Sequence, residues 1–153
     1  MVQDSYIELF DENKALFQAD KPLWWETKRT EAINLLAEKE IESFKDAYAL
    51  DYGINVRRLP FQGDPFSLFR CDIPGLATSN YLVLNDSFYA QVAEANLPKG
   101  VIICSLSNAF KNYADLIKPY LQQTSISSAD MAINTLLAQD GMFIYIPDGV
   151  QLE

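Results

Sequence analysis

Five chain-breaking residues within a sixteen-residue stretch divide this sequence more sharply than any other feature: Pro60, Gly63, Pro65, Pro74 and Gly75. Proline removes a backbone donor and glycine favours turns, so neither a long helix nor a central strand crosses such a stretch. Its apolar side chains still need burial, so we interpret it as an ordered loop packed across a domain surface rather than as a ligand-binding loop. The sequence therefore predicts a helical region over residues 1–50, an extended loop-rich connector over 51–80 and an α/β segment over 81–153.

The first fifty residues show helical periodicity. Ser5 and Glu8 have the spacing of a capping box, and the apolar residues that follow predict an amphipathic helix ending near Gln18. A second helix is expected to begin near Leu23, after Pro22, and its apolar residues continue to Tyr48 as one long helix or two. Of the adjacent Trp24 and Trp25, we expect one in the core and the other packed against the first helix.

The remaining segment alternates short apolar strands with helices. Strands are expected over residues 81–84, 101–105 and 143–146. Helices are expected after Asn85 or Asp86, after Ser107 with a kink or end at Pro119, and from Ser127 or Ser128 to Asp140-Gly141. Residues 150–153 alternate apolar and polar side chains, which predicts a further strand with an open edge. We interpret this as a truncated sheet that continues beyond residue 153.

The residue inventory limits the possible chemistry. The chain has no histidine, which excludes a Ser-His-Asp triad, a Cys-His dyad and imidazole metal ligands. Its two cysteines cannot supply a four-thiolate zinc or cluster site; Cys104 lies in an apolar strand and is expected in the core, and Cys71 in a loop. We therefore predict no catalytic, cofactor-binding or metal-binding residue and no bound cofactor.

Charge and hydropathy bear on partners and location. The net charge of −9 predicts that the chain does not bind nucleic acid. The longest apolar run, Met142–Ile146, is too short to cross a membrane, and the acidic N-terminus lacks the pattern of a signal peptide. These features predict a cytoplasmic protein without membrane contact.

Several blocks of the sequence resemble the SufB/SufD family, and SufD more than SufB. They are Asn85-Asp86-Ser87-Phe88-Tyr89, residues 97–103 (LPKGVII), residues 130–135 (DMAINT) and residues 139–150 (QDGMFIYIPDGV). Upstream, residues 51–56 (DYGINV) and 69–74 (FRCDIP) resemble SufD proteins of Bacteroides-type bacteria. One departure concerns a Gly-x-Pro loop and an aromatic-Lys-Tyr-Thr motif that SufD proteins usually carry after the first helical region. Here Leu36–Ile41 runs directly into Glu42-Ser43-Phe44.

The resemblance implies both a fold and a role. The implied fold class is α+β, with an N-terminal helical region followed by an α/β segment that leads into a truncated right-handed parallel β-helix. The implied role is the N-terminal region of a SufD-type scaffold subunit of the SufBCD iron–sulfur cluster assembly complex. The implied partners are SufB and the ATPase SufC. The family's residues for SufC and for the cluster lie beyond residue 153, so none is transferred to this chain.

Two other readings stay open from the residues alone. One is a free-standing acidic protein-binding module with Trp24 and Trp25 exposed. The other is a small enzyme with a carboxylate or tyrosine base in the loop from Pro60 to Pro74, for example Asp64 or Asp72. No convergent polar motif supports the enzyme reading.

Overall fold

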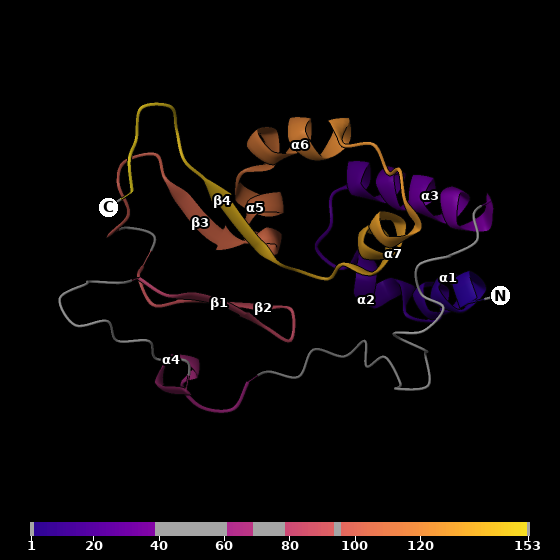
Figure 1. Cartoon of the computed structure of the whole chain (residues 1–153), viewed down its shortest axis with the longest axis horizontal. Helices are drawn as coiled ribbons and strands as arrows, with labels where there is room; N and C mark the ends of the chain where they lie inside the picture. The colour runs from indigo at the N-terminus through magenta and orange to yellow at the C-terminus, as the bar shows by residue number, and fades with distance from the viewer. Residues whose placement is uncertain (1, 39–60, 69–78, 94–95, 153) are drawn as a thin grey trace. The chain divides into compact units, whose positions relative to one another are not determined.

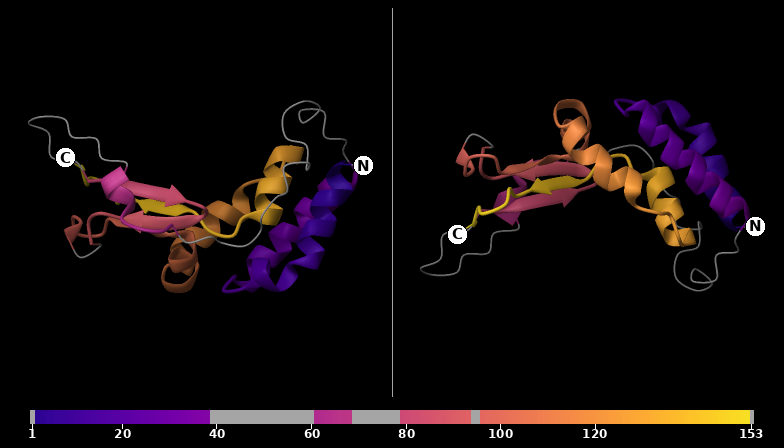
Figure 2. Two further views of the ribbon diagram at one scale, coloured as in Figure 1. Left: turned by 90° about the horizontal axis from the view of Figure 1, so that it is seen from below. Right: turned by 90° about the horizontal axis from the view of Figure 1, so that it is seen from above.

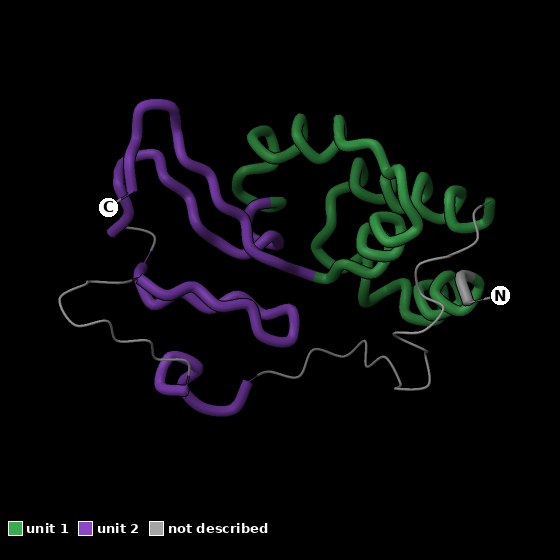
Figure 3. Tube along the Cα trace, in the orientation of Figure 1, with its two compact units in different colours: residues 1–56, 110–139 green, residues 57–109, 140–153 purple. Residues whose placement is uncertain are grey.

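The computed structural model describes residues 2–38, 61–68, 79–93 and 96–152 (Figure 1). These residues fall into two compact units (Figure 3). The helical unit comprises residues 1–56 and 110–139, and the sheet unit comprises residues 57–109 and 140–153. The predicted division at residues 50 and 80 stays a prediction. Beyond Glu38, the continuation of the second helix to Tyr48 and the direct connection from Leu36–Ile41 to Phe44 lie outside the described residues.

In the described part of the helical unit, four helices form the core: α1 (Val2–Glu12), α2 (Lys14–Gln18), α3 (Leu23–Glu38) and α7 (Ala129–Leu137), and α6 (Ala114–Gln123) belongs to the same unit. Figure 2 shows α1, α3 and α7 lying side by side. Their apolar faces form one core, made of Tyr6, Phe10, Phe17, Ala32, Leu36, Ala132 and Leu136. The predicted first helix is interrupted at Asn13, whose side-chain amide donates to the Leu9 carbonyl at 2.9 Å. The predicted cap at Ser128 is confirmed, because its hydroxyl accepts from the Met131 amide at 3.2 Å.

Both tryptophans pack against Phe110, with ring centroids 5.5 Å from it in each case. Trp25 is buried, as expected for one member of the pair, and Trp24 is half-buried. The aromatic partners of Trp24 are Trp25 and Phe110, and the expectation that the second tryptophan packs against the first helix stays a prediction. The alternative of a protein-binding module with both tryptophans exposed is wrong for Trp25, because this side chain is buried.

Arg29 lies in the middle of the helical unit, with a side chain only 1% exposed. Its guanidinium donates to the carbonyls of Phe17 and Ala138, at 2.7 and 3.0 Å, and to Glu26 Oε1 at 2.7 Å. The same group lies 5.5 Å from the centre of the Phe10 ring. Burial lowers the pKa of Arg29 from its ordinary value, while the charge and hydrogen bond of Glu26 act in the opposite direction.

Two lysines near Arg29 make similar contacts. Lys21 donates to the Gln139 carbonyl, and Lys28 donates to the Thr124 carbonyl at 3.1 Å and pairs with Glu31 at 2.8 Å. The carbonyls that receive these three cations lie at the C-terminal ends of α2, α6 (Ala114–Gln123) and α7. Helix C-termini carry unpaired carbonyls and a partial negative charge, so cations stabilise them. The segment from Lys21 to Arg29 therefore connects helices that are about a hundred residues apart in sequence.

The described residues of the sheet unit form two antiparallel two-stranded sheets. The first pairs β1 (Tyr81–Leu84) with β2 (Ser87–Ala90), and the second pairs β3 (Ile102–Ser105) with β4 (Met142–Tyr145). A short helix, α4 (Pro65–Leu68), precedes them, and α5 (Leu106–Asn112) follows β3. The described residues thus have a mixed α+β fold, and no β-helix occurs among them.

The helix expected after Asn85 or Asp86 is wrong, because a β-hairpin forms there. Asn85 and Asp86 have φ values of 49° and 59°, the left-handed conformation that a two-residue hairpin turn requires. Asparagine and aspartate tolerate this conformation better than other non-glycine residues. With Phe88 and Tyr89 following as good strand formers, the local sequence favours a second strand over a capped helix.

Three further boundaries differ from expectation. One predicted helix is two, α5 and α6, which are separated at Tyr113, and α6 continues four residues past Pro119 to Gln123. The cap of α5 is Ser105, not Ser107, because the Ser105 hydroxyl accepts from the Asn108 amide at 3.0 Å. Residues 150–152 form no strand, since the Val150 amide closes a turn onto the Pro147 carbonyl at 3.2 Å.

Replacing Arg29 with methionine tests the cation cluster. Arg29→Met leaves the Phe17 and Ala138 carbonyls and Glu26 Oε1 without this donor, so we expect the free energy of unfolding to fall by about 3 kcal/mol. Urea unfolding followed by tryptophan fluorescence measures the change. Lys118→Met, at an exposed site on α6, is the matched control and should change it by about 0.5 kcal/mol or less. Equal effects of the two substitutions would contradict the role given to Arg29.

The hairpin turn yields a second prediction. Asn85→Val places a β-branched residue in the left-handed region, and we expect it to destabilise the hairpin by about 1–2 kcal/mol. Asp86→Gly is the control and should not destabilise it, because glycine adopts positive φ freely. Hydrogen exchange of the amides in β1 and β2 reports the difference. Unchanged protection in Asn85→Val would show that the turn is not left-handed.

Candidate docking surface on strand β4

The last strand, β4, is held in place at both of its ends. At its start, the Asp140 carboxylate accepts from the Ser107 amide at 2.8 Å, and the Gly141 carbonyl accepts from the Leu106 amide at 2.9 Å. Beyond its end, Pro147 lies so close to Gly100 that a Cβ on Gly100 would stand 2.9 Å from the proline ring. Gly100 also has a φ of +86°, so only glycine suits this position. These contacts fix the orientation of the side chains between them.

One face of β4 is apolar and exposed. Met142, Ile144 and Ile146 alternate along the chain and are 43%, 50% and 44% exposed. Residues at every second position of a strand project to the same side, so Met142 and Ile144 share one face. With Ile146, which directly follows the strand, they are here called the β4 stripe. Ile103, which lies opposite Ile144 in β3, is only 8% exposed. The same face of the sheet is therefore covered over β3 and open over β4.

The outer edge of β4 has few features that discourage pairing. Within the described part of the chain β4 pairs with β3 alone. Residues 142–146 contain neither a charged residue nor a proline, the two devices that usually protect an edge strand. An edge strand with an exposed apolar stripe is typical of a surface that another element covers.

The residues that carry chemistry do not converge. Among the described residues, no group of three or more histidine, cysteine, aspartate or glutamate side chains is arranged to hold a metal ion. Cys104 is buried in β3, as expected, and Cys71 lies outside the described residues. Asp64 is exposed and accepts from the Phe66 amide at 3.0 Å, which is a local turn contact. Asp72 lies outside the described residues. No described helix is long and apolar enough to cross a membrane.

Comparison with known proteins decides the family. The whole chain, residues 1–153, matches the family described as SufBD protein N-terminal region. The chain belongs to this family. No solved structure matches it.

Two curated relatives illustrate the similarity of this SufBD N-terminal region. The chain is 45% identical over 64 residues to the iron-sulfur cluster assembly SufBD family protein ycf24 of Porphyra purpurea. It is 48% identical over 50 residues to the SufBD family protein ABCI9 of Arabidopsis thaliana. The matched segments are 40% and 31% of this chain but only 12% and 11% of the relatives, so the chain corresponds to a small part of each.

The resemblance to the SufB/SufD family is thus confirmed at the level of the family, whereas the choice of SufD over SufB stays a prediction. The β4 stripe was not singled out from the sequence. Its signal was present, because Met142, Ile144 and Ile146 alternate with aromatic residues in a run that was expected only to form a strand. A strand with apolar residues at every position does not reveal which face is covered.

A lysine at the centre of the β4 stripe tests its exposure. Because Ile144 is half-exposed, we expect Ile144→Lys in this SufBD N-terminal region to lower the binding of a hydrophobic dye while stability changes by about 0.5 kcal/mol or less. Val83→Lys is the matched control, since Val83 is 43% exposed in β1. Dye fluorescence and thermal unfolding of both variants measure this. If Ile144→Lys unfolds the protein while Val83→Lys does not, Ile144 is buried and the stripe does not exist.

Proposed function

We propose that this chain is the N-terminal part of a SufD-type scaffold subunit of the SufBCD complex, which assembles iron–sulfur clusters in the cytoplasm. In this role it covers the start of the scaffold's following β-helix and docks partners, without catalysis of its own. SufB and SufC are the proposed partners. The observation that carries the proposal is the β4 stripe, an apolar face that the described residues leave uncovered.

The family match and the sequence blocks support this role. The match extends over the whole chain, and the curated relatives are named iron-sulfur cluster assembly proteins. The block that contains β4, residues 139–150, is the one in which the resemblance to SufD is most specific. A strand that leads into further strands needs an apolar face and a pairing-competent edge, and β4 has both.

The residue inventory also supports a structural role. An iron–sulfur cluster is usually held by four cysteine thiolates, and the chain has two cysteines and no histidine. Cys104 is buried in β3, opposite Phe143 in the ladder. An iron–sulfur cluster handled by the complex would therefore need ligands from other parts of the complex. This region would act on where the cluster lies and would not supply its ligands.

The alternative is a free-standing acidic protein-binding module. The observation that favours it is the surplus of exposed carboxylates on the helical unit, which would suit a basic partner. The two proposals differ in what covers the β4 stripe: the following part of a longer scaffold subunit in the first, and a separate protein in the second.

Co-purification distinguishes them. We expect the full-length gene product, co-expressed with SufB and SufC, to recover both partners, and a version lacking residues 1–153 to recover less of them. A full-length variant with Met142→Lys and Ile144→Lys should behave like the deletion, whereas Val83→Lys should not.

Two outcomes would overturn the proposal. Full recovery of the partners by the deletion variant would show that this region does not dock them. Failure of the unaltered full-length protein to recover either partner would remove the SufD assignment and favour the binding module.

A further inference from the structure

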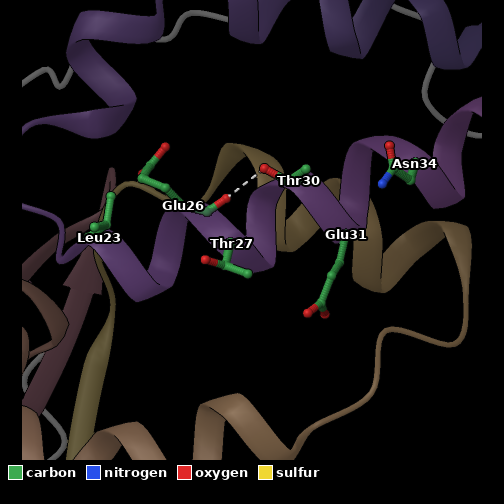
Figure 4. A pocket seen from close by; sticks show the side chains of 6 residues that line it. All are labelled: Leu23, Glu26, Thr27, Thr30, Glu31 and Asn34. Carbon is green, nitrogen blue, oxygen red and sulfur yellow. Dashed lines mark hydrogen bonds between the residues drawn. The ribbon is translucent and has the colours of Figure 1, made fainter.

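The outer face of α3 carries a groove that the proposed scaffold role does not use. It has a volume of about 370 Å³ and is lined by side chains from nearly three turns of the helix: Leu23, Glu26, Thr27, Thr30, Glu31 and Asn34. Figure 4 shows these side chains along one stretch of α3, with Leu23 at one end and Asn34 at the other. The spacing of Leu23, Thr27, Thr30 and Asn34 places them on one face of the helix.

The shape of the groove suits a second helix. Thr27 and Thr30 are short, and the Thr30 hydroxyl is turned onto its own helix, where it donates to the Glu26 carbonyl at 3.0 Å (Figure 4). Leu23 is 85% exposed, the largest fraction among the exposed large apolar residues of the described chain. A row of short side chains beside an exposed leucine is the surface into which the ridge of another helix packs.

The carboxylates of the groove are already oriented. Glu26 bonds Arg29 at 2.7 Å and Gln18 at 2.7 Å, and Glu31 bonds Lys28 at 2.8 Å. Side chains held in this way lose less conformational entropy when a partner binds.

The charge of α3 is distributed unevenly between its faces. Its two basic residues, Lys28 and Arg29, are buried and pair with Glu31 and Glu26 from the inner side, so the exposed residues of α3 include carboxylates and no cation. The same bias extends over the described helical unit, where exposed carboxylates outnumber exposed amines nine to three. The acidic residues are Asp4, Glu8, Asp11, Glu12, Asp20, Glu31, Glu38, Asp115 and Asp130, and the basic ones are Lys14, Lys111 and Lys118. Such a surface attracts a cationic partner.

We propose that the outer face of α3 is a docking groove for a basic amphipathic helix of a partner protein. In this arrangement an apolar side chain of the partner packs beside Leu23 over Thr27 and Thr30, and its lysines or arginines lie near Glu26 and Glu31. This binding is separate from the β4 stripe, because its residues belong to the helical unit and β4 to the sheet unit.

The probe is a helical peptide of alanine, leucine and lysine with leucine and lysine on adjacent faces, and its counterpart with glutamate in place of lysine. We expect the lysine peptide to bind the chain, with an affinity that falls as salt is added, and the glutamate peptide not to bind. Thr30→Arg fills the groove and adds a cation, and should weaken binding at least about tenfold. Leu23→Ala, at a site too exposed to affect folding, should weaken it about threefold or more.

The matched control is Gln122→Arg, which adds the same charge at an exposed position of α6. It should change the affinity less than about twofold. Circular dichroism of each variant verifies that the helices remain folded. Three results would each overturn the proposed docking groove. They are absence of binding by the lysine peptide, equal weakening by Thr30→Arg and Gln122→Arg, and an unchanged affinity in Leu23→Ala.

Discussion

The helical unit depends on the buried guanidinium of Arg29. Its hydrogen bonds to Phe17, Glu26 and Ala138 join the end of α2, the body of α3 and the end of α7, where carbonyls would otherwise lie unpaired. Lys21 and Lys28 satisfy two more carbonyls at the ends of α7 and α6. The apolar core around Phe10 and Leu136 can close only because these polar groups have partners.

The burial of Lys28 and Arg29 also determines which side chains are exposed on the outer face of α3. Since the cations of α3 point inward, its outer face is left with carboxylates, threonines and Leu23, which form the groove. In the sheet unit a different constraint applies. The Asp140 carboxylate, the Gly141 carbonyl and the close approach of Pro147 to Gly100 hold β4 at its two ends, and one face of the strand stays exposed. Both candidate surfaces thus follow from where each unit places its polar contacts.

Local patterns predicted a good part of the fold. The start of α3 after Pro22, the strands expected at 81–84, 101–105 and 143–146 and the cap at Ser128 all have short-range signals. The structure confirms these elements, with β3 beginning one residue later and β4 lying one residue earlier than expected. The hairpin was missed because Asn85 and Asp86 suit both a helix cap and a left-handed turn, and the strand-forming Phe88 and Tyr89, which pair with Val83 and Leu82, were not weighed against the cap. Burial of Lys28 and Arg29 was not foreseeable, since it depends on carbonyls about a hundred residues away. The β4 stripe likewise required knowing which side of the strand is covered.

The central claim is that the β4 stripe is an interface within a larger assembly, and methionine oxidation tests it directly. Met142 is 43% exposed in β4, and Met131, 36% exposed in α7, serves as an internal reference in the same chain. Hydroxyl-radical footprinting with mass spectrometry would compare the isolated region with the full-length protein bound to SufB and SufC. The account predicts that oxidation of Met142 falls sharply relative to Met131 in the complex. Equal oxidation of Met142 in both samples would contradict it.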